Sequence, residues 1–173
     1  ADNIKLAYLK ARKGKATKSD VLAFRVELHE HLESIRREIV SVDPMFGDYS
    51  TFTVTDPKPR TIFAPSFRER VIHHAIMNIT EPYFDRYLID QTYAYREKKG
   101  THKALLQAFH YTKGSDYFCK MDVRKYFDSI DHEVLKQLLR RRFKDQTLLH
   151  VFNRIIDSYE TAPGKGVPIG NLT

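Results

Sequence analysis

Apolar residues recur along most of the chain at the three- and four-residue spacing that is typical of amphipathic helices. Residues 1–13 are predicted to form one helix, whose apolar face carries Ile4, Ala7, Tyr8 and Ala11. A second helix is predicted to run to about residue 40, with Thr17 or Ser19 as its N-cap. The N-terminal part of the chain is therefore expected to be helical.

A third helix is predicted after Pro65, where Ser66 and Glu69 form a capping box. The proline within "TEPYFDRYLID", residues 80–90, is expected to break this helix before a short aromatic segment. The apolar stripe of the helix comprises Val71, Ile72, Ala75, Ile76 and Ile79.

Strand-like patterns occur in two places. "TFTVT" at 51–55 and "RTIFA" at 60–64 flank the turn "DPKP", which predicts a β-hairpin with a basic tip. "DYFCKMDV" at 116–123 is predicted to be a strand, with Phe118, Lys120 and Asp122 on one face. Together with the helices, these strands predict an α+β fold that is mostly helical.

The remaining helices lie in the second half of the chain. Thr101 is predicted to cap a helix that runs to about Tyr111 and ends at Gly114. Asp131 is predicted to cap a helix with Val134, Leu135, Leu138 and Leu139 inward and three arginines at its end. A further helix is expected over 145–159, before a loop rich in glycine and proline.

Composition narrows the class of partner. The chain has 173 residues and a net charge of +7, which favours a polyanion, nucleic acid first and an anionic membrane second. No apolar run approaches the length of a membrane span, and the N-terminus lacks the apolar region of a secretory signal. A single cysteine, Cys119, suits a reducing cytosol, and no zinc-binding pattern of cysteine and histidine occurs.

Three carboxylates stand close together in "KMDVRKYFDSIDH", residues 120–132. Asp122 lies at the end of the predicted strand, where it is either a turn residue or a ligand of a hard cation such as Mg²⁺. Asp128 is more simply a local hydrogen-bond acceptor, and Asp131 a helix cap. One aspartate cannot hold the two ions of a phosphoryl-transfer site, so such a site needs further carboxylates from elsewhere.

Four blocks of this sequence resemble the reverse transcriptase family, in the family's order. "MDVRKYFDSIDH" (121–132) resembles the first catalytic palm motif, and "PRTIFAPSFRERVIHHAI" (59–76) resembles the fingers motif. "TYAYREKKGTHKAL" (92–105) resembles the next block, and "GKGVPIGNLT" (164–173) the segment before the catalytic strand pair.

The resemblance implies a right-hand polymerase with fingers and a partial palm, in which the hairpin belongs to the fingers and a small antiparallel sheet to the palm. The expected division is an N-terminal helical segment (1–45), fingers (46–104), the palm with its first metal-binding motif (105–132), fingers and palm helices (133–162) and the start of the next palm motif (163–173). The implied activity is RNA-directed DNA synthesis, with an RNA template, a DNA primer, deoxynucleotides and two Mg²⁺ ions, or Mn²⁺ in their place.

Individual roles follow from the matched positions. Asp122 matches the first catalytic, metal-binding aspartate, and Val123 matches the position whose backbone carbonyl is a further ligand. Phe127 matches the aromatic residue that excludes a 2′-hydroxyl, although ordinary packing would also account for a phenylalanine there. Arg60 matches the arginine that contacts the triphosphate, and Lys58 is a weaker candidate for the same contact.

Basic residues outside these positions are candidates for holding nucleic acid. Arg68 and Arg70 flank the start of the third helix, where a solvated face is the alternative and is favoured for Arg68. A further basic patch would track a strand, with a solvated loop as the alternative, and comprises Arg96, Lys98, Lys99 and His102. Of the adjacent His73 and His74, one is expected to pack and the other to line the cleft, because neighbours on a helix diverge by about 100°.

Two departures from the family pattern refine the match. Ile169 stands where many members carry a glutamine that contacts the nucleotide, and "PIGNLT" is more similar to reverse transcriptases of diversity-generating retroelements than to the group II intron type. No Tyr-x-Asp-Asp motif occurs, so the chain is expected to be an N-terminal fragment that is inactive alone and able to pair with another copy through an exposed sheet edge. A non-catalytic nucleic-acid-binding module is the second reading, and a bacterial cytosol the expected location. A Mg²⁺ nuclease would need a cluster of acids that these motifs do not supply.

Overall fold

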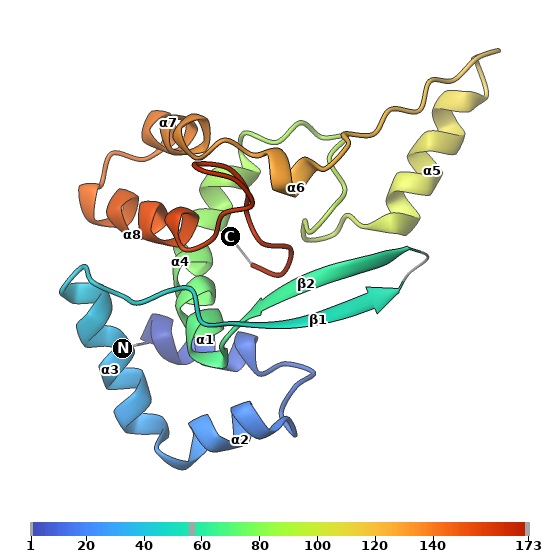
Figure 1. Cartoon of the computed structure of the whole chain (residues 1–173). Helices are drawn as coiled ribbons and strands as arrows, with labels where there is room; N and C mark the ends of the chain where they lie inside the picture. Colours follow the sequence, from blue (N-terminus) through green and yellow to red (C-terminus); the bar gives the residue numbers. More distant parts are fainter. Residues whose placement is uncertain (1, 56–57, 172–173) are drawn as a thin grey trace. The chain divides into compact units, whose positions relative to one another are not determined.

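The computed structural model describes residues 2–55 and 58–171 and confirms a mixed α+β fold. Its helices and strands are labelled in Figure 1. The chain divides into two units, one formed by residues 1–78 with 125–173 and the other by residues 79–124. The elements are α1 (Asp2–Ala11), α2 (Ser19–Val26), α3 (Leu28–Val40), β1 (Tyr49–Thr55), β2 (Pro59–Pro65), α4 (Phe67–Asp85), α5 (Thr101–Thr112), α6 (Tyr126–Ser129), α7 (His132–Arg142) and α8 (Gln146–Asp157).

The N-terminal helices pack through aromatic rings in the first unit. Tyr8 stacks on Phe24 with 6.0 Å between ring centroids, and Phe24 meets Phe67 of α4 edge-on at 5.1 Å. The predicted apolar face of α1 is buried as expected. The single helix predicted up to residue 40 is wrong, because Glu27 leaves the helical conformation (φ −115°, ψ 45°) and divides it into α2 and α3.

The two paired strands of the predicted hairpin are confirmed, while Asp56 and Pro57 of the predicted turn lie outside the described residues. β1 and β2 are antiparallel, and the register places Val54 opposite Arg60 and Tyr49 opposite Pro65. Side chains towards the tip are exposed, whereas those near the base of β2 become buried. The hairpin is thus anchored at its base, and the outer part presents its side chains to solvent.

Helix α4 begins as predicted but ends later. The Ser66 hydroxyl accepts a hydrogen bond from the Glu69 amide at 3.3 Å. The Glu69 carboxylate does not complete a capping box, because it instead accepts from the amides of Asp48 (2.9 Å) and Gly47 (3.4 Å). Burial of this carboxylate raises the pKa of Glu69. The predicted break at Pro82 is wrong, since the helix continues through it to Asp85.

The N-caps of the other helices agree only in part with those predicted from the sequence. Asp131 and Asp145 cap α7 and α8 by accepting hydrogen bonds from the amides of Val134 (3.1 Å) and Leu148 (2.9 Å). The N-cap of α2 is Lys18, not Thr17 or Ser19, and that of α5 is Gly100, not Thr101. Neither of these two N-caps makes a side-chain capping bond.

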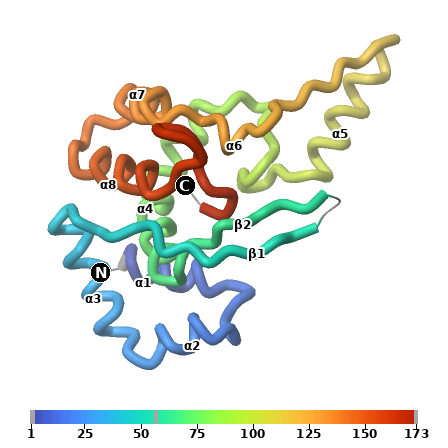
Figure 2. Tube along the Cα trace, viewed as in Figure 1, coloured from blue at the N-terminus to red at the C-terminus, as the bar shows by residue number. Residues whose placement is uncertain are grey.

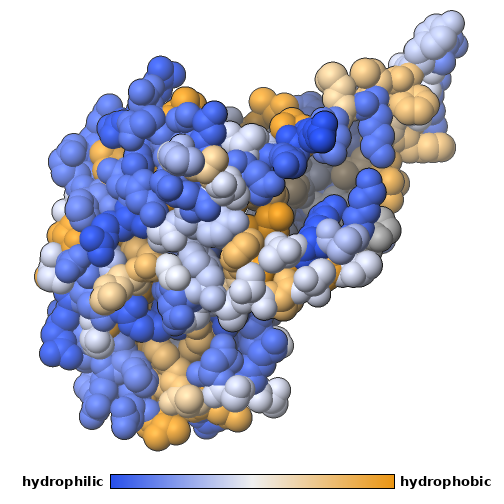
Figure 3. Space-filling view, in the orientation of Figure 1, coloured by the Kyte–Doolittle hydropathy of each residue, from blue (hydrophilic) through white to orange (hydrophobic). Residues whose placement is uncertain are grey.

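Helix α7 buries only part of its predicted apolar face, whereas α8 buries several apolar side chains. Leu139 of α7 is buried, as are Leu149, Phe152 and Ile155 of α8. Val134 and Leu138 are exposed, so the prediction of four inward residues on α7 is wrong for these two, while the outer surface around both helices is largely hydrophilic in Figure 3. The predicted apolar stripe of α4 is likewise only partly buried, because Ile79 is exposed.

The predicted strand at 116–123 is not a strand in the structure. These residues are irregular and exposed, and β1 and β2 form the two-stranded sheet of the described chain. An extended segment becomes a strand only when a neighbour completes its ladder of hydrogen bonds, and no described strand pairs with this one. The α5 helix of the same unit also exposes apolar side chains, namely Leu105, Leu106 and Phe109.

Candidate functional site

The segment that carries Phe127 is the short helix α6. Lys125 precedes it in the left-handed conformation (φ 51°, ψ 43°), which turns the chain into the helix. The Phe127 ring remains 42% exposed and meets Tyr126 edge-on at 5.2 Å. The ring is therefore available to a ligand and is not part of the buried core.

A loop from the far end of the chain docks on this segment. The Val167 amide donates to the Phe127 carbonyl at 3.0 Å, and the Gly166 amide donates to the Ile130 carbonyl at 2.8 Å. The Thr161 hydroxyl donates to the Asp128 carbonyl at 2.8 Å. This bond is made by the Asp128 backbone carbonyl to a distant residue, so the predicted local acceptor role of the Asp128 carboxylate stays a prediction. Three residues of the loop thus hold the backbone of residues 127–130.

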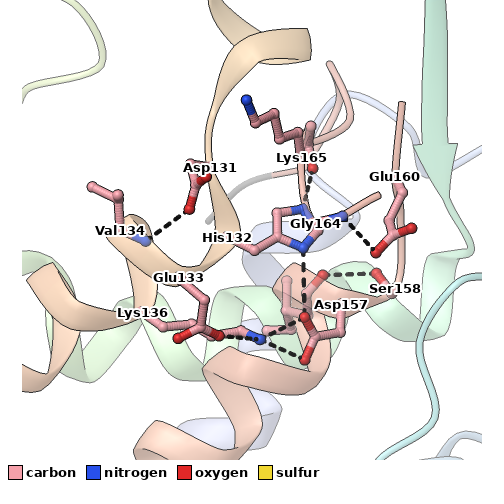
Figure 4. Close-up of polar contacts among 12 residues, drawn as sticks. Asp131, His132, Glu133, Val134, Lys136, Asp157, Ser158, Glu160, Gly164 and Lys165 are labelled. Atoms are coloured by element: carbon pink, nitrogen blue, oxygen red, sulfur yellow. Dashed lines mark hydrogen bonds and ion pairs between the residues drawn. The ribbon is translucent and has the colours of Figure 1, made fainter. Parts of the chain in front are cut away.

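His132 stands at the centre of this junction. Its amide donates to the Gly164 carbonyl at 2.9 Å, and its Nε2 lies 2.7 Å from the Gly166 carbonyl. The Asp157 carboxylate lies 3.5 Å from Nδ1 and also pairs with Lys136 at 2.7 Å, as Figure 4 shows. The side chain is buried, and the sequence reasoning attached no role to it.

The same loop continues onto the hairpin. The Phe63 amide of β2 donates to the Ile169 carbonyl at 3.1 Å. The Tyr159 ring lies 4.8 Å from that of Phe63, and the hydroxyls of Tyr49 and Ser158 are 2.8 Å apart. Figure 2 shows the end of the chain passing beside β2. Ile169 is half-buried, so its side chain is only partly accessible.

Two cations occupy the outer half of the hairpin. Lys58 and Arg60 are both exposed. Arg60 makes no ion pair with any residue in the described parts of the chain, so its guanidinium is available to an anion. A planar guanidinium can bind two phosphate oxygens at once.

A cavity of about 530 Å³ lies between the base of the hairpin and the loop after α1. Its cations are Lys15, Lys18 and Arg70. Burial, followed by the charge of Arg70, lowers the pKa of Lys15. The apolar part of the lining includes Phe52, Ile62, Pro65 and Phe67. Sequence reasoning assigned no function to the two lysines, although the run "KARKGKATK" was a signal for an anion site.

The arginines at the start of α4 are tied to acidic residues. Arg68 forms an ion pair with Glu38 of α3. Arg70 donates to Asp20 of α2 at 2.8 Å and lies over the Phe67 ring, while it also lines the cavity. Of the two arginines, Arg70 is therefore the one that a ligand in the cavity would contact.

In the unit formed by residues 79–124, two residues of the predicted basic patch form ion pairs and the other two are exposed. Arg96 is 12% exposed and donates to the Asp85 carboxylate at 2.6 Å and to the Ile89 carbonyl at 2.9 Å. Lys99 pairs with Asp90 at 2.6 Å. Lys98 and His102 are exposed. A nucleic-acid contact by this patch stays a prediction, and its exposed members are better placed for one.

Asp122 and Val123 belong to the same unit, and both are exposed. The Asp122 carboxylate forms no hydrogen bond or ion pair that would engage its oxygens with other described residues. Oxygen donors of this kind fit a hard cation. Over residues 2–55 and 58–171 no three acidic, histidine or cysteine side chains converge as a metal site, so further ligands would have to come from elsewhere.

The histidine pair behaves in part as expected. His73 is fully buried against the Phe46 ring, 5.8 Å away, and burial lowers its pKa to about 4. His74 is half-buried, and its pKa is lowered by burial and by Lys10, Lys15 and Arg70. The contribution of the three cations to this lowered pKa indicates that the surroundings of His74 are electropositive. Two of these cations, Lys15 and Arg70, also line the basic cavity.

Curated proteins provide the comparison with known sequences. No family model matches the chain. The group II intron-encoded protein LtrA of Lactococcus lactis subsp. cremoris is 25% identical over 99 residues, which are 57% of this chain and 16% of that protein. Nuclear intron maturase 1, mitochondrial, of Arabidopsis thaliana is 27% identical over 85 residues, 49% of this chain and 12% of the relative.

A longer match is protein YkfC of Escherichia coli, which is 23% identical over 162 residues, 86% of this chain and 42% of that protein. For the first relatives matched, the chain covers only 14% to 16% of their length. Separately, none of the described helices is long and apolar enough to cross a bilayer.

Proposed function

We propose that this chain, a relative of the reverse transcriptases and maturases encoded by group II introns, forms the fingers and part of the palm of an RNA-directed DNA polymerase. The group II intron-encoded protein LtrA and nuclear intron maturase 1 support the family resemblance that the four sequence blocks carry. The observation that supports the polymerase role best is the docked loop of residues 161–170, which joins the Phe127 segment to the hairpin that carries Arg60.

The proposed reaction is nucleotidyl transfer. The 3′-hydroxyl of a primer attacks the α-phosphate of a deoxynucleotide, a new phosphodiester bond forms, and pyrophosphate leaves. Arg60 would bind the triphosphate oxygens, and the partly exposed Phe127 ring would contact the sugar and exclude a 2′-hydroxyl. Both residues act by positioning, which is the main contribution a protein makes to phosphoryl transfer.

Mg²⁺ is the proposed metal, with Asp122 and the Val123 carbonyl as the residues of this chain that would hold it. The metal would neutralise the charge that develops on the phosphate oxygens. The exposed, unpaired carboxylate of Asp122 fits this role. Further ligands would be needed, because no three acidic, histidine or cysteine side chains converge among the described residues.

Nucleic-acid binding is proposed for the basic cavity and the exposed cations. Lys15, Lys18 and Arg70 would contact phosphates, while the apolar floor that includes Phe52 would contact sugar or base. The net charge of +7 supports a polyanionic partner. RNA is the proposed template strand, in keeping with the intron-encoded relatives.

A second candidate function is RNA binding without polymerisation. One relative is named an intron maturase, which favours a role in which the same fold holds RNA without copying it. The two functions share the basic cavity but differ at Asp122, since only the polymerase needs a carboxylate there.

The deciding experiment is primer extension on an RNA template by a full-length protein that contains this chain, compared with its Asp122→Asn variant. A polymerase is expected to extend the primer, and the variant to lose at least about 1,000-fold in rate while it binds RNA normally. Extension that survives the substitution would refute the role of Asp122. RNA binding without extension by the unsubstituted protein would support the second function.

A further inference from the structure

His132 combines burial with contacts to two distant parts of the chain. It is 3% exposed at the first position of α7. The Gly166 carbonyl, 2.7 Å from Nε2, can only accept a hydrogen bond, so Nε2 carries the proton and donates. On the other side of the ring, Nδ1 faces Asp157, which Lys136 holds at 2.7 and 2.9 Å. The orientation of the ring is thus fixed from both sides, as Figure 4 shows.

The turn that His132 contacts is residues 164–167, named here the clamp turn. Its bonds to residues 127–132 are those from Gly166 to Ile130, from Val167 to Phe127, and from the His132 amide to Gly164. Asp131 and Lys165 also form a β-bridge. The imidazole adds a side-chain bond to the middle of the turn, where the backbone of Gly166 is already engaged by Ile130.

Two of the nucleotide-contact candidates, Phe127 and Ile169, are connected to the clamp turn. The Phe127 carbonyl accepts a hydrogen bond from the amide of Val167, the last residue of the clamp turn. Ile169 follows two residues later, and its carbonyl accepts a hydrogen bond from the Phe63 amide. A shift of the turn relative to α6 would therefore move the Phe127 backbone, the Ile169 backbone or both. Displacements of about an ångström are sufficient to change a positioning contact at a reacting nucleotide.

We propose that His132 is a positioning residue for nucleotide selection, which acts through the clamp turn to fix the Phe127 ring against the sugar of the incoming nucleotide. The proposal rests on the proposed polymerase function for its consequence, and on the His132 contacts for its mechanism. Loss of the Nε2 donor leaves the Gly166 carbonyl unpaired in a buried place and loosens the turn.

Three substitutions separate positioning from simple packing. His132→Gln places a donor near the position of Nε2, His132→Asn places one near Nδ1 instead, and His132→Leu keeps bulk without a donor. If His132 acts only through packing, the glutamine and asparagine substitutions should have similar effects, because both residues are smaller, polar and lack the ring. A positioning role through Gly166 requires glutamine to be the better replacement.

The first measurement needs no catalysis. Hydrogen exchange of the Gly166 and Val167 amides in the 173-residue chain is expected to speed up about tenfold or more in His132→Leu and His132→Asn, and to stay close to the original in His132→Gln. Amides of β1 and β2 are the internal control and should keep their protection. Unchanged protection of Gly166 and Val167 in all three variants would overturn the proposal, whatever the activity of the protein.

The second measurement uses the full-length protein that contains this chain. The ratio of kcat/KM for a deoxynucleotide to that for the matching ribonucleotide is expected to fall about tenfold in His132→Asn and to remain within about threefold in His132→Gln. An equal fall in both variants, or no fall in either, would overturn the positioning role. If no variant polymerises and the original protein does not either, the proposed function fails while the exchange experiment still decides whether His132 holds the clamp turn. Should His132→Leu fail to fold, the comparison of glutamine with asparagine carries both measurements.

Discussion

His73 makes the folding stability of this protein depend on pH. Its imidazole is fully buried on α4, and neither ring nitrogen has a hydrogen-bond partner among the residues that the structure describes. The Phe46 ring lies against it at 5.8 Å. Burial disfavours the charged imidazolium, so the pKa of His73 falls from 6.5 to about 4.

The magnitude follows from the difference between the folded and unfolded pKa. As pH falls below 6.5, the His73 imidazole is protonated in the unfolded chain but stays neutral in the folded chain until pH approaches 4. Protonation therefore favours the unfolded state across this range. A difference of about 2.5 units at 1.36 kcal/mol per unit corresponds to about 3 kcal/mol. Stability is therefore highest above pH 6.5, decreases across the window from 6.5 to 4, and changes no further below it on account of this residue.

Urea unfolding at about pH 7 and about pH 4 measures the effect, with His73→Leu as the test variant. The variant is expected to lose about 3 kcal/mol less than the original chain between the two pH values. At pH 7 it should be at least as stable, because leucine replaces two buried nitrogens that lack partners. Exposed His150→Gln is the matched control and should follow the original chain.

The result that would refute this reasoning is an identical pH dependence for the original chain and His73→Leu. That outcome would mean that the imidazole becomes charged in the folded state at no cost, through water or a rearranged partner. A smaller common decrease in all three proteins is expected from His74, whose pKa is also lowered, and it cancels in the comparison.

The proposed sites give three further predictions. Arg60→Ala in the full-length polymerase should raise KM for the deoxynucleotide about tenfold with a smaller effect on kcat, and an unchanged KM in steady-state primer extension would contradict the triphosphate contact. Replacing both Lys15 and Lys18 by glutamine should weaken RNA binding by this chain and reduce the slope of log affinity against log salt by about 1.4, while Lys5→Gln should have a smaller effect. Ile169→Gln should lower misincorporation by the full-length enzyme, and an unchanged error spectrum would contradict a nucleotide contact at that position.

Local patterns predicted the elements whose structure depends on near neighbours. The hairpin follows from two β-branched runs around a turn, and the capping bond of Asp131 follows from its side chain and the amide three residues later. The buried half of α4 likewise follows from helical periodicity. These features need no knowledge of how distant segments meet.

Predictions that depended on distant partners were less successful. The 116–123 segment has the composition of a strand, but composition cannot supply the neighbouring strand that a ladder requires. Pro82 removes one hydrogen bond near the end of α4, and the helix tolerates that loss for the single turn that remains. The local sequence around Lys15 and Lys18 cannot predict that the fold brings them beside Arg70 and the base of the hairpin.

The glycines of the final block show how a tertiary contact can nevertheless be written in a short sequence. Gly166 has φ 103°, and a Cβ atom there would lie 2.9 Å from the Thr161 amide nitrogen. Gly170 has φ 138°, and a Cβ atom would lie 2.5 Å from the Phe63 carbonyl oxygen. A side chain at Gly166 would clash with Thr161 inside the loop itself, whereas one at Gly170 would push the loop off β2. Glycine is therefore required at Gly166 by the close turn of the loop on itself, and at Gly170 by the close approach of the loop to β2.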